Sequence, residues 1–245
     1  MKRYTILFVG GPNVSNFGSK IGLAEELASR GHEVFYSVTP RLVPGSNSNS
    51  THYWGSKVQL LHCGNDLLTK AETDALVARM AQDDLSALAE MIGALVGTYR
   101  LHVDAIRKQW KSSARALPDL IITDTIDNGG QVLAELWNVP VMYVNPHGLS
   151  NGVGQCYYDP PWIPQLEVPL GPDMNVLEKV ANFLVLAVGY RAVLQGTFIN
   201  SPLNAYRASL GLPAVSAFAY DEMPNAAGMF YFELAGCMHT EFLML

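Results

Sequence analysis

The sequence predicts an α/β fold, in which a doubly wound and mostly parallel sheet carries helices on both faces. Short apolar runs alternate with longer segments whose apolar residues recur every three or four positions. The first strand, helix and strand fit within residues 4–38, an arrangement that implies parallel pairing. Apolar residues make up 49% of the 245 positions and charged residues only 16%, so the chain can bury a sizeable core.

Five apolar runs are expected to form the strands of this sheet. The first is closed by Gly10, Gly11 and Pro12, which break a strand. The last two each follow a helical segment, as the alternation of a doubly wound fold requires. In chain order the predicted strands are residues 4–9, 33–38, 57–62, 119–123 and 139–144.

The helices are expected where apolar residues follow helical spacing. The longest apolar stripe runs from Leu85 to Trp110 and predicts one long helix with a core-facing side. Gly31 suits the left-handed stop of the first helix, and Asp127 or Asn128 suits the amino-terminal cap of the helix that ends near Trp137. The predicted helices are residues 21–30, 85–110, 128–137, 177–194 and 202–210, with an ordered loop at 152–172.

Charge and composition exclude several classes of function. The chain has 16 basic and 22 acidic residues, a net charge of −6, and no basic cluster is evident in the sequence. A nucleic-acid partner is therefore not expected. No membrane span is expected either, because the most apolar later stretch, 180–194, contains Asn182 and Arg191 and is shorter than the roughly 20 residues required.

The cysteines and histidines give no sign of a metal site. Cys63, Cys156 and Cys237 are scattered and form no CxxC pair. His52, His62 and His102 lie far apart without metal-ligand spacing. Sparse cysteine and the lack of an apolar signal-peptide core predict a reduced, cytoplasmic protein with no metal.

Four loops should hold the functional site, because open α/β sheets bind ligands at the carboxyl ends of their strands. These loops are residues 10–18, 39–56, 124–128 and 145–165. The first loop lacks GxGxxG spacing, and Pro12 removes a backbone donor that could cradle phosphate. A nucleotide site and a bound cofactor are therefore not expected in this part of the chain.

Two residues in these loops have both a structural and a catalytic interpretation. Asp124 directly follows the fourth strand, where it either caps the next helix or points into a site. Asp127 competes for the cap, which leaves Asp124 available for other chemistry. His147 follows the fifth strand, where it acts either as a hydrogen-bonding loop residue or as a catalyst.

Three landmarks, in order, resemble the family-1 UDP-glycosyltransferases. The first is Ile6–Val9 followed by Leu23–Val34, which includes the sequence RGHEV. The second is Pro118–Asp124 continuing into Leu133–Val141, and the third is Asn204–Pro213. The resemblance implies one Rossmann-like half of a GT-B fold, in which the amino-terminal domain holds the acceptor and the carboxyl-terminal domain binds the UDP-sugar.

The resemblance also implies how this chain is divided. Residues 1–213 are expected to form the acceptor-binding domain, and residues 214–245 a divergent tail or the start of an interdomain linker. The donor-binding domain is expected to be absent, because no Trp/Pro/Gln-rich stretch followed by His-Cys-Gly occurs. The face that would meet that domain is then bare, and self-association through it is a further expectation.

The family's catalytic pair is carried over onto two positions. The family uses a histidine in the first loop as general base and an aspartate after the fourth strand to hold its tautomer. Asp124 matches the aspartate, whereas Asn16 stands where the histidine is expected. Because an asparagine cannot accept a proton at neutral pH, attack by an alcohol should suffer more than attack by a phenol. The acceptor wall is expected to consist of Phe17, His147, Tyr157, Tyr158 and Trp162.

Three functions remain open on the sequence alone. The first is inverting, metal-independent hexosyl transfer from a UDP-sugar to a small apolar acceptor, with the UDP-sugar as co-substrate and this chain inactive by itself. The second is a non-catalytic binding or interaction module with the same fold, which the asparagine at position 16 would suit. The third is an unrelated oxidoreductase, which the glycine spacing of the first loop disfavours.

Overall fold

A computed structural model gives the fold of the chain in nine ranges. It describes residues 2–10, 14–39, 57–64, 67–82, 84–124, 128–145, 173–184, 201–215 and 226–231. In chain order the elements are β1 (Thr5–Val9), α1 (Val14–Ser29), β2 (Glu33–Val38), β3 (Gln59–His62), α2 (Lys70–Met80), α3 (Leu85–Ser112), β4 (Leu120–Asp124), α4 (Asn128–Trp137), β5 (Val141–Asn145), α5 (Val176–Leu184), α6 (Ser201–Ser209) and β6 (Ala226–Tyr231).

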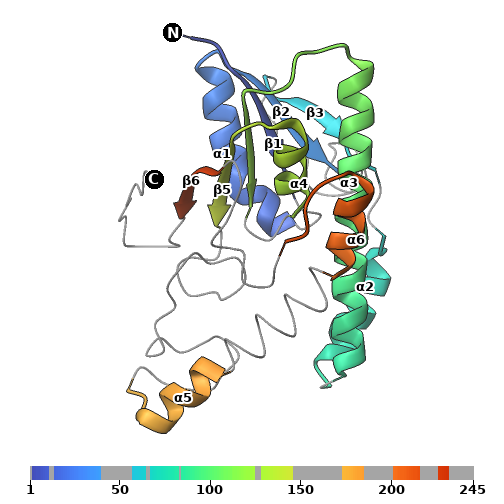
Figure 1. Cartoon of the computed structure of the whole chain (residues 1–245), viewed down its shortest axis with the longest axis vertical. Coiled ribbons are helices and arrows are strands. Elements are labelled where there is room, and N and C mark those ends of the chain that lie inside the picture. Colours follow the sequence, from blue (N-terminus) through green and yellow to red (C-terminus); the bar gives the residue numbers. More distant parts are fainter. Residues whose placement is uncertain are drawn as a thin grey trace.

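All six strands join one parallel sheet in the order β3-β2-β1-β4-β5-β6 (Figure 1). This confirms the predicted α/β fold and its five predicted strands, whose ends agree with the prediction to within two residues. The sixth strand, β6, lies within residues 214–245, for which the sequence predicts a tail or linker. It extends the sheet by pairing in parallel with β5.

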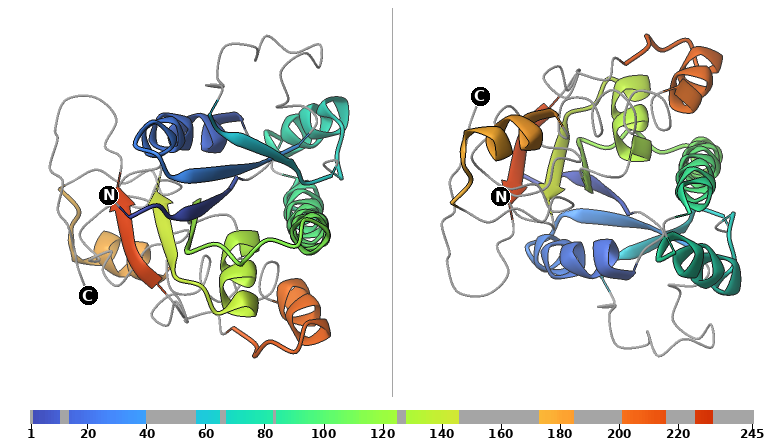
Figure 2. Two further views of the ribbon diagram at one scale, coloured as in Figure 1. Left: turned by 90° about the horizontal axis from the view of Figure 1, so that it is seen from above. Right: turned by 90° about the horizontal axis from the view of Figure 1, so that it is seen from below.

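Helices cover both faces of the sheet, so its strands are buried on two sides. Figure 2 shows α1 on one face and α4 on the other, with α3 beside α4. Leu7 and Val9 of β1 pack in the core beneath α3 and α4, whereas Ile6 and Phe8 pack beneath α1. This alternation follows from the twofold side-chain period of a strand and explains why β1 reads as a continuous apolar run.

The structure differs from the prediction in two helices, α1, which begins earlier, and α2, which the sequence does not predict. Helix α1 begins at Val14, so the connection after β1 is shorter than the predicted loop at 10–18. Helix α2 is a separate element with a capping box, in which the Thr69 hydroxyl accepts from the Glu72 N–H and the Glu72 carboxylate accepts from the Thr69 N–H. Gly31 has a φ of 93°, which confirms the predicted left-handed stop of α1.

The later helices agree with the prediction as far as they are described. Helix α6 corresponds to the predicted helix at 202–210, and α5 to the start of the one at 177–194, whose residues 185–194 lie outside the described residues. None of the described helices is both long enough and apolar enough to cross a membrane.

Candidate functional site

The strand order reverses at one point in the sheet, between β1 and β4. From β1 the chain moves outward through β2 to β3, and it then returns to place β4 on the other side of β1. In open α/β sheets, ligands bind beyond the carboxyl ends of the strands at such a point. Val9, the last residue of β1, is in register with Thr123 of β4. The two strands therefore end at the same edge of the sheet.

The two residues of the predicted catalytic pair lie at or just beyond the carboxyl ends of these two strands. Asp124 is the last residue of β4, and Asn16 lies in the first turn of α1, shortly after β1 ends. Phe17 follows in the same turn. The backbone thus brings positions 16, 17 and 124 to one edge of two paired strands, while the orientation of these three side chains lies outside the description.

The other predicted site residues fall in the connection after β5. His147, Tyr157, Tyr158 and Trp162 all lie outside the described residues. Strand β5 pairs with β4 in parallel and ends at Asn145, so this connection also starts from the carboxyl edge of the sheet.

The end of β1 is held tightly against β2. The Gly10 N–H donates a buried hydrogen bond of 3.0 Å to the Ser37 hydroxyl of β2. A Cβ on Gly10 would lie 3.0 Å from a ring carbon of Tyr36, closer than ordinary van der Waals contact. The Tyr36 ring stacks on Phe8 with its centroid 5.3 Å away. A side chain at position 10 would therefore require the Tyr36 ring to shift.

The start of α4 is equally close to the end of β4. A Cβ on Gly130 would lie 2.3 Å from both the Cβ and the Oγ1 of Thr123, which is fully buried. Gly130 therefore allows the first turn of α4 to approach β4 directly before Asp124. The amino-terminal end of a helix carries partial positive charge, which favours an anionic group at this edge of the sheet.

A buried ion pair fixes α6 to α4. Arg207 of α6 and Glu135 of α4 are 1% and 5% exposed, and the two guanidinium NH groups donate to the two carboxylate oxygens. The bond from Nη1 to Oε1 measures 2.9 Å. Arg207 Nε also donates to the Pro213 carbonyl at 2.8 Å. Sequence reasoning missed this pair, although Glu135 and Arg207 lie in the second and third landmarks of the resemblance.

Further contacts hold the segment around α6 in place. Asn204 and Val215 exchange two hydrogen bonds of 2.8 Å, from Nδ2 to the carbonyl and from the Val215 N–H to Oδ1. The Tyr206 hydroxyl donates to Asp104 of α3 at 2.9 Å. Burial, and secondarily this hydrogen bond, raises the pKa of Tyr206. The third landmark thus serves to attach α6 to the helical layer.

The described histidines lie away from the switch point or are buried. His32 sits at the amino edge of the sheet, where its Nδ1 accepts a hydrogen bond from the Tyr4 N–H at 3.2 Å. His102 of α3 is 2% exposed, and burial lowers its pKa to about 4, which keeps the imidazole neutral. Within the described ranges, no three His, Cys, Asp or Glu side chains form a group that could hold a metal ion.

Two curated proteins are similar in sequence to this chain. UDP-glucuronosyltransferase 2B30 of Macaca fascicularis is 22% identical over 182 residues, which cover 67% of this chain and 33% of that protein. NDP-glycosyltransferase YjiC of Bacillus subtilis (strain 168) is 27% identical over 142 residues, 58% of this chain and 32% of that protein. The match therefore spans about a third of each relative. No family model matches the sequence.

Solved structures of two glycosyltransferases share the fold over nearly the whole chain. The calicheamicin glycosyltransferase CalG4 matches 95% of this chain and 47% of its own with a TM-score of 0.56 at 18% identity. The glycotransferase of kitacinnamycin matches 94% of this chain and 46% of its own with a TM-score of 0.53 at 15% identity. At these identities the likeness concerns the fold, and it corresponds to one of the two halves of a GT-B structure.

Proposed function

We propose that this chain, a relative of the family-1 glycosyltransferases with the fold of one half of their GT-B architecture, is the acceptor-binding part of a UDP-sugar-dependent hexosyltransferase. The sequence relatives are a UDP-glucuronosyltransferase and an NDP-glycosyltransferase, which supports a glycosyltransferase with a nucleotide-sugar donor. The acceptor would be a small apolar molecule with a hydroxyl group. The reaction would be metal-independent and would invert the configuration of the sugar carbon.

One observation carries this proposal more than any other. Strands β1 and β4 end at the same edge of the sheet at its switch point; Asp124 is the last residue of β4, and Asn16 lies in the first turn of the helix that follows β1. These are the positions that the resemblance assigns to the catalytic pair. Four further residues proposed for the acceptor wall, His147, Tyr157, Tyr158 and Trp162, follow β5 in the sequence, and β5 ends at this edge of the sheet.

The chemistry of this pair differs from that of a histidine and an aspartate. In the inverting reaction, the acceptor hydroxyl attacks the sugar carbon, the bond to the UDP leaving group breaks, and the hydroxyl proton must be removed. Asn16 can orient the hydroxyl by hydrogen bonding but cannot take that proton. General-base assistance contributes roughly 10²–10⁴ in rate. A phenol, with a pKa near 10, depends less on this assistance than an alcohol does. The preferred acceptor is therefore phenolic.

The residues that bind the UDP-sugar donor are proposed to lie outside residues 1–213. The first loop has no phosphate-binding glycine pattern, and Pro12 lacks an N–H. The chain alone should therefore bind an acceptor without transferring sugar to it. Holding donor and acceptor together contributes roughly 7–11 kcal/mol to such a reaction. We place the protein in the cytoplasm, on the basis of its few, scattered cysteines.

A second candidate is a non-catalytic binding module with the same fold. Asn16 favours it, because the position proposed for the general base carries a residue that cannot act as one. The two candidates share an acceptor site and differ only in whether sugar is transferred.

Sugar transfer by a fusion protein distinguishes the two candidates. The chain is fused to the donor-binding half of a related glycosyltransferase, and release of UDP from UDP-glucose is measured with a phenol and with an alcohol as acceptors. Transfer to the phenol by the fusion, and none by the 245-residue chain alone, supports the enzyme. A fusion that binds the phenol but transfers no sugar supports the binding module, and turnover by the chain alone contradicts the proposed division.

A further inference from the structure

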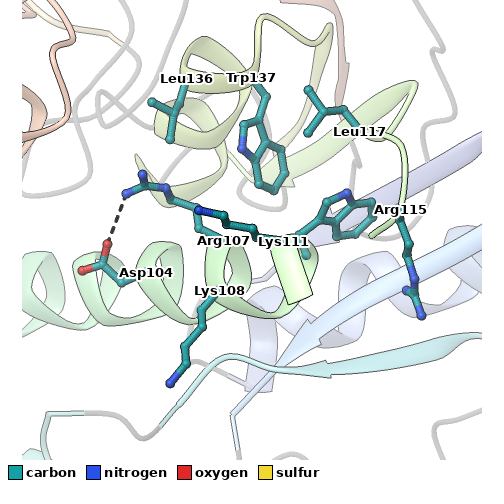
Figure 3. A pocket seen from close by; sticks show the side chains of 9 residues that line it. Asp104, Arg107, Lys108, Lys111, Arg115, Leu117, Leu136 and Trp137 are labelled. Atoms are coloured by element: carbon teal, nitrogen blue, oxygen red, sulfur yellow. Dashed lines mark ion pairs between the residues drawn. The ribbon is translucent and has the colours of Figure 1, made fainter. Parts of the chain in front are cut away.

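A hollow of about 640 Å³ lies between the carboxyl-terminal ends of α3 and α4 (Figure 3). We call it the α3–α4 hollow. Its lining comes from α3, from the connection that follows α3, and from the last turn of α4. The residues that line it are Asp104, Arg107, Lys108, Trp110, Lys111, Arg115, Leu117, Leu136 and Trp137.

The hollow is distinct from the site at the switch point. Helix α3 ends at Ser112 and leads to the amino end of β4, and α4 ends at Trp137 and leads to the amino end of β5. The hollow therefore lies toward the amino edge of the sheet, whereas Asn16 and Asp124 lie at the carboxyl edge. A ligand here would not occupy the acceptor site.

Positive charge is concentrated in this hollow. Four of the chain's 16 lysines and arginines line it, together with a single carboxylate, although the chain carries a net charge of −6. That carboxylate, Asp104, already accepts a hydrogen bond from Tyr206 and lies 3.6 Å from Arg107. Among the described residues, Lys108 and Lys111 have no ion-pair partner.

The four cations do not all face the same way. Figure 3 shows Lys111 extending along α3 beneath the ring of Trp137, toward Arg107. Lys108 and Arg115 extend away from Trp137, and the Arg115 guanidinium lies 4.4 Å from the centroid of the Phe35 ring. Lys111 and Arg107 are therefore the two lining cations that extend on the Trp137 side of the hollow.

The opposite wall of the hollow is apolar and aromatic. Leu136, Trp137 and Leu117 form it in Figure 3, and Leu117 is 48% exposed. The Trp137 ring packs against the buried Trp110 with centroids 5.8 Å apart, and Trp110 is fixed by a 3.0 Å hydrogen bond to the Ala116 carbonyl. This wall is therefore held in place by the core without a ligand.

Helix-dipole complementarity accounts for only part of this arrangement. Basic residues are common in the last turn of a helix, where they interact with its free carbonyl groups. Lys111 fits that role, but Arg107 lies more than a turn earlier. Lys111 and Arg107 are also four residues apart on one helix, a spacing at which like charges destabilise the helix. An anion between them would remove that repulsion.

We propose that the α3–α4 hollow binds a small molecule in which an anionic group is attached to an aromatic body. The anionic group, a phosphate or carboxylate, would bind between Arg107 and Lys111, and the aromatic body would lie against Trp137 and Leu136. Such a site combines an apolar wall with a few charged groups that set the orientation, as small-molecule sites commonly do.

Binding of 1-naphthyl phosphate to the full chain tests the proposal. Its dissociation constant is measured by titration calorimetry and compared with those of two controls. 1-Naphthol has only the aromatic body, and inorganic phosphate has only the anionic group. The phosphate ester should bind about tenfold more tightly than either, because each half contributes about 1.4 kcal/mol or more. In amide NMR spectra, the indole N–H signals of Trp110 or Trp137 should shift during the titration.

Two matched lysine variants locate the charge. Lys111→Gln should weaken binding of the ester about tenfold, as expected for loss of a charge-assisted contact. Lys108→Gln removes the same charge from the same helix, but the Lys108 side chain extends away from Trp137. It should therefore change binding of the ester less than about twofold at physiological ionic strength, where charges beyond about 8 Å are screened. Lys111→Arg should retain binding.

Several outcomes would overturn the proposal. They are equal effects of Lys108→Gln and Lys111→Gln, binding of 1-naphthol as tight as that of the ester, or no binding of any probe at millimolar concentration. Thermal unfolding shows whether each variant is folded. If Lys111→Gln is unfolded, binding of the ester by Lys111→Arg is compared with binding by Lys108→Gln instead.

Discussion

Arg207 on α6 and Glu135 on α4 form a buried, doubly hydrogen-bonded ion pair across 72 positions of the sequence. Helix α4 starts beside the end of β4, where the candidate site lies, and α6 packs on the outer side of this layer (Figure 2). The pair therefore connects α4, which borders the candidate site, to α6, which comes later in the chain.

Removing one partner of this pair should destabilise the fold strongly. Arg207→Met would leave the Glu135 carboxylate buried without its counter-charge, which costs about 3–5 kcal/mol. The free energy of unfolding in urea measures the loss. The double variant Arg207→Met with Glu135→Leu should recover most of it, because a buried pair can be replaced by apolar residues at little cost. A double variant as unstable as Arg207→Met alone would contradict this account.

The close approach of α4 to β4 should make Gly130 intolerant of a side chain. Gly130→Ala would place a methyl group 2.3 Å from the buried Thr123 side chain, so the helix must shift, at a cost of about 1–3 kcal/mol. Gly22→Ala is the matched control in α1, where a Cβ meets nothing within 4 Å. It should stabilise the chain by about 0.5–1 kcal/mol. Chemical denaturation compares the two, and an equal effect of both substitutions would refute the close contact.

Burial of His102 should make the chain less stable in mild acid. Its pKa is lowered from 6.5 to about 4 by burial, so between these values the unfolded chain binds a proton that the folded chain does not. Stability from this residue is therefore complete above pH 6.5 and falls as the pH drops toward 4, by about 3 kcal/mol in total.

The free energy of unfolding of the wild type and of His102→Leu, measured at several pH values from 7 to 4, tests this dependence. The variant should lose less stability over this interval, and His62→Gln, at an exposed position, serves as the control. An unchanged slope in His102→Leu would show that other groups cause the acid sensitivity.

The sequence predicts the first five strands well because each is a short apolar run between strand-breaking residues. Ile121 and Ile122 of β4 are both buried, one on each face, as a continuous apolar run implies. Strand β6 is harder to predict, because it contains Gly228 and two alanines, which have low strand propensity. The sequence predicts a loop at the start of α1 for a similar reason, because residues 14–19 include serine, asparagine and glycine, which have low helix propensity.

The site could be predicted only where local sequence sets the position of the backbone. The positions of Asn16 and Asp124 follow from the strands that precede them. The ion pair between Glu135 and Arg207 could not be predicted, because nothing local links residues so far apart in one sequence. The basic lining of the α3–α4 hollow is not evident in the sequence, because three of its cations alternate with the core-facing residues of α3 and the hollow forms only where α3 lies beside the end of α4.

The most direct test of the proposed function is the effect of Asn16→His in the fusion with a donor-binding half. If position 16 holds the general base, the new imidazole can take the acceptor proton while Asp124 stabilises its charged form. Transfer to an alcohol should rise by about 10²–10⁴, and transfer to a phenol distinctly less. Adding Asp124→Asn should remove most of the gain, because the two residues act as a unit. A fusion that is active with the phenol and whose rate with the alcohol does not change on Asn16→His would contradict the assignment of position 16.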